Sequence, residues 1–164
     1  MNTHRASFLE GMSRAAASVS VVTTDGGAGR DGVTVSSMTS VSADPPTMLV
    51  CIHNETATAH AIRENGVFCI NLLRDDQAAL SNIFAGFAEA PGDDKFSAGD
   101  WVMAEGAAPR LANALVTFQC RVTDCHPSGS HFVIVGEVLE TAVDDGQPLI
   151  YGARSYGTPR YHGG

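Results

Sequence analysis

Apolar and β-branched residues recur in short runs along most of the chain, separated by turns rich in Gly, Pro, Asp and Ser. Runs of this kind are typical of β-strands. The predicted strands cover residues 18–25, 32–41, 47–53, 67–73, 114–126, 131–143 and 148–151. The pattern therefore predicts a protein built mainly from strands.

Helical spacing of apolar residues occurs in three places. Phe8, Leu9, Met12 and Ala16 recur at this spacing near the start, which predicts an amphipathic helix that ends near Ser18. We expect this helix to cap or pack beside the core. Two shorter helices are predicted over residues 56–65 and 75–86.

The last two long strands form a predicted antiparallel hairpin. Residues 114–126 and 131–143 alternate apolar and polar positions over part of their length, and the turn Pro127-Ser128-Gly129-Ser130 joins them. The helices are too few and too short to alternate with every strand, which disfavours a doubly wound parallel sheet. The sequence predicts a β-barrel with peripheral helices.

A long segment rich in Gly, Pro and Asp, residues 87–113, separates the second short helix from the hairpin. Loops of this length in compact domains are more often functional than idle. No repeat or linker divides the sequence, so we expect one domain over residues 1–164.

Composition narrows the classes of partner. The chain of 164 residues is 44% hydrophobic and carries a formal charge of −8, with no cluster of Lys and Arg. This balance argues against nucleic acid and against an anionic membrane surface. No apolar run is long enough to span a bilayer, and the first residues lack the apolar core of a signal peptide. We expect a cytoplasmic protein.

The cysteines and histidines suggest neither a disulfide framework nor a metal site. The four cysteines have no CxxC spacing, and three lie in apolar runs, where a thiol acts as a small hydrophobic group. We expect them to be reduced and mostly structural. His126 and His131 lie near Cys125, but their spacing matches no zinc pattern.

A match to GxGxxG at residues 27–32 raises the possibility of a dinucleotide-binding fold. That motif works by opening a helix whose first amides hold a pyrophosphate. Here the β-branched segment Val33-Thr34-Val35 follows, so no helix is expected. The glycines instead predict a hairpin loop between strands 18–25 and 32–41.

The segment from Gly32 to Pro46 is unusually rich in hydroxyl side chains. Val33 and Val35 define one face of a strand, but Met38 and Val41 are out of step, which predicts a bulge or bend around Ser36 and Ser37. A bend exposes main-chain donors and acceptors that suit the pyrimidine edge of a flavin. An edge strand with its hydroxyls in water explains the same residues.

Two threonines follow strand 47–53. Thr56 or Thr58 is expected to cap the helix over residues 56–65. The first amides of such a helix, with adjacent hydroxyls, form a natural phosphate site. A plain N-cap accounts for the threonines equally well.

Taken together, several segments resemble the flavin reductase family with the FMN-binding split-barrel fold, the reductase components of two-component monooxygenases. The segments are GVTVSSMTSVSADPPTMLVCI, FCINLLRDDQAALSNIFAG, DKF, GSHFVIVGEV and PLIY, in the family's order between Phe8 and Tyr156. The resemblance implies a Greek-key split β-barrel with a few peripheral helices and a homodimer with flavin near the subunit interface. It also implies reduction of FMN or FAD by NADH or NADPH.

The resemblance also implies a set of flavin contacts. The isoalloxazine would lie along Thr34, Val35, Ser36 and Ser37, and the ring and ribityl chain beside Cys51, His53 and Asn54. The phosphate would lie near Thr56 and Thr58, with Lys95 as a nearby cation. Phe87, or Phe84, would contact the ring or the dimer partner.

For the nicotinamide, the resemblance implies His131 as the residue that contacts NAD(P)H or the reduced flavin, with Tyr151 and Arg154 nearby. The family's Gly-Asp-His appears here as Gly129-Ser130-His131. Hydride transfer needs no protein nucleophile or general base, because the two ring systems carry the chemistry.

Two functions remain open at this stage. One is an NAD(P)H:flavin oxidoreductase that supplies reduced flavin to a separate oxygenase. The other is a flavin-binding, storage or electron-transfer module on the same barrel. The sequence does not decide between FMN and FAD, between NADH and NADPH, or between a tightly held flavin and one that passes through as a substrate.

Overall fold

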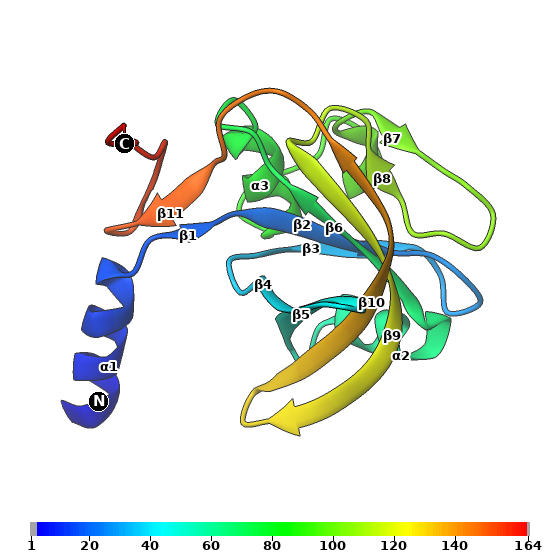
Figure 1. Ribbon diagram of the computed structural model, residues 1–164, viewed down its shortest axis with the longest axis horizontal. Helices are drawn as coiled ribbons and strands as arrows, with labels where there is room; N and C mark the ends of the chain where they lie inside the picture. Colours follow the sequence, from blue (N-terminus) through cyan, green and yellow to red (C-terminus); the bar gives the residue numbers. More distant parts are fainter. Residues whose placement is uncertain (1–2, 164) are drawn as a thin grey trace.

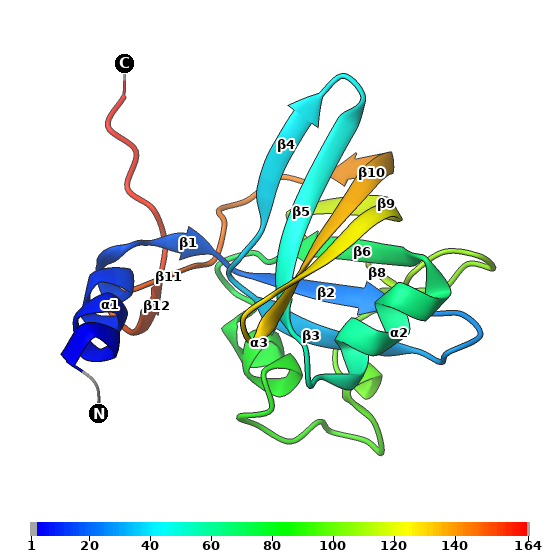
Figure 2. The ribbon, with the colours of Figure 1, turned by 90° about the horizontal axis from the view of Figure 1, so that it is seen from below.

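The computed structural model describes residues 3–163, so residues 1, 2 and 164 of the expected domain lie outside the described residues. Its main element is a seven-stranded antiparallel sheet in the order β3-β2-β6-β9-β10-β5-β4. The strands are β2 (Ser20–Thr24), β3 (Asp31–Val35), β4 (Thr39–Ala43), β5 (Pro46–His53), β6 (Val67–Leu72), β9 (Val116–Ser128) and β10 (His131–Val143). The sheet curls into a barrel-like body, with α2 (Ala57–Asn65) and α3 (Ala78–Phe84) at its periphery (Figures 1 and 2). The predicted mainly β fold is confirmed.

The predicted bend in the hydroxyl-rich segment is confirmed. β3 ends at Val35 and β4 begins at Thr39, so Ser36, Ser37 and Met38 join two separate strands. These strands stand at opposite ends of the sheet order. The three linking residues therefore connect the two edges of one curled sheet.

Both predicted hairpins are present. β9 and β10 pair from Val116–Val143 to Ser128–His131, with Gly129 in the left-handed region at φ 57° in the turn. β2 pairs with β3 across the glycine-rich loop, and no helix follows that loop before β3. The match to GxGxxG therefore has the wrong context for a dinucleotide site.

The core has two clusters, and β2 serves both. Val22 packs in the first cluster with Phe68 and Ile134, and Val21 packs in the second with Leu73. Successive side chains of a strand point to opposite faces, so a strand buried on both faces carries no polar alternation. Helix α2 adds Ala59 and Ile62 to the first cluster.

Helix α2 has the start and stop that its sequence predicts. The Thr56 hydroxyl accepts a hydrogen bond from the Ala59 N–H at 3.2 Å, and Gly66 ends the helix at φ 74° with its N–H bonded to the Ile62 carbonyl. A side-chain cap at one end and a left-handed glycine at the other satisfy main-chain groups that a helix leaves open.

Helix α1 (Thr3–Arg14) differs from the prediction in two respects. It ends at Arg14 rather than near Ser18, because β1 (Ala17–Ser18) pairs with β11 (Ile150–Gly152). It buries none of its residues, and it stands apart from the barrel, joined to it through the small β1-β11-β12 sheet (Figure 1). The expectation that it packs beside the core is wrong, because its apolar face meets no other part of the described chain closely enough to be buried.

The remaining elements are short. The predicted helix over residues 75–86 is limited to α3, and the predicted strand over 148–151 is shifted to β11, which pairs with β12 (Ser155–Gly157). The long segment 87–113 holds η1 (Lys95–Ser97) and the pair β7 (Trp101–Val102) and β8 (Arg110–Leu111).

All four cysteines are free thiols. Burial raises the pKa of Cys120 to about 12 and also raises the pKa of Cys69, so both stay protonated at neutral pH. Such thiols behave as small core residues, as the sequence predicts. In residues 3–163, no helix has the length and apolar character needed to cross a bilayer.

Candidate functional site

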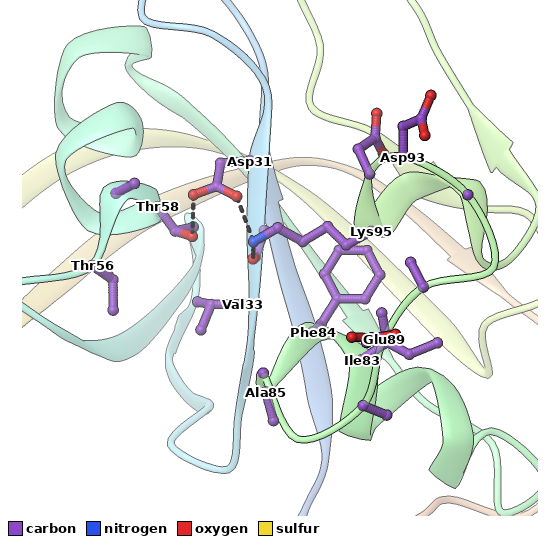
Figure 3. A pocket seen from close by; sticks show the side chains of 17 residues that line it. Asp31, Val33, Thr56, Thr58, Ile83, Phe84, Ala85, Glu89, Asp93 and Lys95 are labelled. Carbon is purple, nitrogen blue, oxygen red and sulfur yellow. Dashed lines mark hydrogen bonds and ion pairs between the residues drawn. The ribbon is translucent and has the colours of Figure 1, made fainter.

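Three cavities surround strand β3, and Val33 lines all of them. The helix cavity, of about 620 Å³, lies between β3, the start of α2, the end of α3 and the segment up to Lys95 (Figure 3). The tyrosine cavity, of about 710 Å³, is bounded by β3, α3 and the β11–β12 hairpin. The histidine cavity, of about 280 Å³, lies between residues 33–37 and the facing ends of β5 and β10. The three cavities are therefore neighbours along one strand.

Strand β3 is an edge strand of the large sheet. β3 pairs with β2 along one edge only, within the part of the chain that the structure describes. The Gly32 carbonyl accepts a hydrogen bond from Lys95 Nζ at 2.7 Å, so it faces away from β2. Peptide groups alternate between the two edges of an antiparallel strand, so those of Thr34 should face the same free edge. Because Lys95 takes the Gly32 carbonyl, the peptide groups of Thr34 are the ones expected to remain for a flat polar ligand.

The hydroxyl groups of Thr34, Ser36 and Ser37 differ in their hydrogen bonding. Ser37 Oγ donates to the Cys51 carbonyl at 2.6 Å and accepts from the Cys51 N–H at 3.1 Å, which ties the bend to β5. Thr34 Oγ1 donates to the Ser81 carbonyl at 2.7 Å. Ser36 is exposed beside the histidine and tyrosine cavities. Ser36 is therefore the hydroxyl of this group best placed for a ligand.

His131 and His53 form one wall of the histidine cavity. They are paired residues of β10 and β5, and their ring centroids are 5.2 Å apart. Ser130 Oγ lies 2.9 Å from His131 Nδ1. The serine that stands at the family's aspartate position thus still engages the ring, and Nε2 remains as the second donor or acceptor.

Asn54 lies outside the three cavities. Its N–H donates to the Ser130 carbonyl at 2.9 Å, and its side-chain amide donates to the Gly129 carbonyl at 3.4 Å. These bonds fasten the end of β5 to the turn that carries His131. Asn54 therefore helps to hold in place the turn that precedes His131.

The helix cavity brings together the three residues predicted near a flavin phosphate, but each is already engaged. Thr56 Oγ1 donates to the His53 carbonyl at 2.8 Å, and Thr58 Oγ1 donates to Asp31 Oδ2 at 2.8 Å. Lys95 Nζ lies 2.6 Å from Asp31 Oδ1 (Figure 3). Sequence reasoning missed Asp31, which appeared there only as part of the glycine-rich loop.

The tyrosine cavity contains further polar residues that sequence reasoning missed. The Tyr156 hydroxyl lies 2.9 Å from Ser81 Oγ and donates to Asn82 Oδ1 at 2.9 Å. The ring of Tyr151 stands edge-on to that of Tyr156, with centroids 5.5 Å apart. The polar pair Ser81-Asn82, in the middle of the apolar run of α3, was the available signal.

Arg154 lines the tyrosine cavity but is bound to helix α1. Its Nη2 lies 2.8 Å from Glu10 Oε2. The Arg154 guanidinium, followed by that of Arg14, holds the pKa of Glu10 below its usual value. Ala153 and Arg154 form the β11–β12 turn with φ of 50° and 59°, a left-handed conformation that non-glycine residues rarely adopt. The structure places Arg154 and Tyr151 in a different cavity from His131.

The two candidate phenylalanines lie in different surroundings. Phe87 is 84% exposed at the edge of the tyrosine cavity. Phe84 is buried, and its ring packs against those of Phe96 and Trp101 in the second core cluster. Phe84 therefore acts mainly as a core residue that also borders the helix cavity.

A family model described as "Flavin reductase like domain" matches residues 12–160 of the chain. The chain belongs to the flavin reductase family. It is 41% identical over 160 residues to a protein of Ancylobacter novellus named "FMN reductase (NADH) RutF", with 94% of this chain and 87% of that protein covered.

Solved structures of flavin reductases have the same fold. The NADH:FAD oxidoreductase of Streptomyces globisporus superposes with a TM-score of 0.85 at 25% identity, covering 99% of this chain and 96% of that chain. A homologue of nitrilotriacetate monooxygenase component B from Mycobacterium thermoresistibile gives 0.85 at 28% identity, covering 96% and 87%. The split-barrel fold implied by the sequence is thereby confirmed.

Proposed function

We propose that this flavin reductase oxidises NADH or NADPH and reduces FMN or FAD. The observation that carries the proposal is that three cavities border β3 and share Val33; we infer that a flavin and a nicotinamide nucleotide occupy them beside this strand. The relatives support it, since one is named an FMN reductase that uses NADH and another an NADH:FAD oxidoreductase.

The residues present fit a flavin. The peptide groups of Thr34 are expected to face the unpaired edge of β3, Ser36 adds an exposed hydroxyl, and the volumes of the helix and tyrosine cavities are typical of small-molecule sites. We infer that the flavin contacts are Thr34, Val35, Ser36, Ser37, Cys51, His53, Thr56, Thr58, Phe87 and Lys95, with Asn54 supporting the turn. When bound, the flavin supplies an acceptor for the hydride of the nicotinamide.

The protein's own residues bind and orient. We infer that His131, held through Nδ1 by Ser130, contacts the nicotinamide nucleotide or the reduced flavin, and that Tyr151 and Arg154 bind the nucleotide from the tyrosine cavity. No side chain acts as nucleophile in this scheme.

The activity is tested by mixing the purified protein with NADH or NADPH, with and without FMN or FAD, and following the loss of reduced nicotinamide. We expect rapid oxidation only when a flavin is present, either added or retained from purification, since the protein itself contributes binding and not a redox group. Absence of flavin-dependent oxidation with every pair would refute the proposal. Flavin binding without oxidation would favour a storage module.

We further propose that the protein is a homodimer, in which a second copy covers the apolar face of α1. Phe8, Leu9 and Met12 are 63%, 42% and 53% exposed, and at 100° per residue they fall on one face of the helix. An exposed apolar face of this kind marks an interaction surface.

A double variant, Phe8→Glu with Met12→Glu, should halve the mass measured by light scattering, because charges would replace the apolar contact. Ser7→Glu, on the opposite face of the same helix, is the matched control, and the measured mass should stay that of two copies. A wild-type mass of one copy would contradict the proposal.

The relative named as a monooxygenase component supports a separate oxygenase as the consumer of reduced flavin. We also place the protein in the cytoplasm, and its free cysteines support a reducing compartment.

A further inference from the structure

A single carboxylate, that of Asp31, organises the inner wall of the helix cavity. Oδ1 lies 2.6 Å from Lys95 Nζ, and Oδ2 accepts the Thr58 hydroxyl at 2.8 Å. The Asp31 side chain is 19% exposed and that of Lys95 is 36% exposed, so solvent screens this pair less than a surface ion pair. Figure 3 shows the two interactions at the start of β3, facing the first turn of α2.

Most side-chain hydrogen-bond donors at this wall already bond to acceptors of the protein itself. A threonine hydroxyl has one proton, and Thr58 gives its proton to Asp31 while Thr56 gives its proton to the His53 carbonyl. The Lys95 ammonium has three N–H groups, of which one faces Asp31 and another faces the Gly32 carbonyl. A phosphate would therefore find few free side-chain donors here.

The charged side chains that line the helix cavity also disfavour a phosphate. The residues that line the helix cavity include one ammonium, Lys95, and four carboxylates, on Asp31, Glu89, Asp93 and Asp94. Asp31 is the carboxylate in contact with Lys95, and it offsets that residue's attraction for an anion. A phosphate dianion gains little in such surroundings beyond what the first amides of α2 supply.

We propose that Asp31 is a specificity-determining residue that makes this site nearly indifferent to the flavin phosphate, so that the protein accepts riboflavin almost as well as FMN. The inference rests on the proposed flavin-binding function. Asp31 acts by holding Lys95 and Thr58, the two side chains that would otherwise select for the phosphate.

The test measures equilibrium dissociation constants for FMN and riboflavin by quenching of flavin fluorescence. For the wild-type protein we expect the two constants to differ by less than about tenfold. Asp31→Asn removes the charge and keeps the size, and it should tighten FMN by about tenfold, the effect of a hydrogen bond to a charged group, while riboflavin changes little.

Asp93→Asn is the matched control. It removes one carboxylate from the same cavity, but Asp93 is exposed and lies away from Lys95 and Thr58 (Figure 3). We expect it to shift the ratio of the two constants by much less than Asp31→Asn does, since water screens an exposed carboxylate more strongly.

Three results would overturn the inference. Asp31→Asn could weaken FMN relative to riboflavin, which would make Asp31 a support for phosphate binding, or it could leave the ratio unchanged. The third needs no variant, because a wild-type preference for FMN of more than about tenfold would be too strong for a site that is nearly indifferent to the phosphate. If the wild-type protein binds neither flavin, the proposed function itself fails.

Discussion

Replacing Gly136 with alanine should lower the free energy of unfolding by about 3 kcal/mol, at the upper end of the usual cost of overpacking a core. A Cβ at this position would lie 2.6 Å from the ring of Phe68 and 2.9 Å from Cβ of Cys120. Phe68 is fully buried, so its ring cannot move aside without disturbing the first core cluster. Urea unfolding followed by circular dichroism measures the loss.

Gly27→Ala is the control for this experiment, because nothing lies within 4 Å of a Cβ at Gly27. We expect it to change stability by no more than about 0.5 kcal/mol. Phe68→Leu should reduce the penalty of Gly136→Ala in the double variant, since the shorter side chain leaves space. Equal costs in both backgrounds would show that the ring is not the obstacle.

His131→Ala should lower kcat/KM for NADH by about tenfold to a hundredfold, the cost of losing a hydrogen bond to a polar or charged ligand group. The dissociation constant for FMN should change much less, because the free edge of β3 and the start of α2 remain intact. Steady-state rates at limiting and saturating NADH, together with a flavin titration, separate the two effects.

His126→Ala is the matched control for His131. His126 lies on the neighbouring strand of the same hairpin, where it is exposed and its Nε2 lies 2.9 Å from Asp124 Oδ2. It lines none of the three cavities, so its loss should leave both constants unchanged. Unaltered activity of His131→Ala at limiting NADH would remove His131 from the site.

The sequence predicted those features that depend on neighbours along the chain. The out-of-step positions of Val33, Val35, Met38 and Val41 predicted a bend within a strand over residues 32–41, because the side-chain period of a strand is two. The structure has that bend, with two separate strands, β3 and β4, on either side of it. The N-cap of α2 and the β9–β10 turn were predicted for the same local reason.

Features that depend on distant contacts were missed. Asp31 meets Thr58 and Lys95, which are 27 and 64 residues away, so the glycine-rich loop around it gave no sign of its role. The position of α1 was missed because an apolar stripe shows that a helix has a face to bury but not what covers it. Strands β7 and β8, of two residues each, are too short to produce a periodic signal.

The link from Ser36 to Met38 has a consequence for how the family's ligand range can change. It joins the two edge strands of one sheet, and Ser36 is exposed and lines two of the three cavities. Substitutions of Ser36 would alter what a ligand meets without removing a residue from either core cluster. Substitutions of Ser36 can therefore change which ligands the protein binds while the fold stays the same.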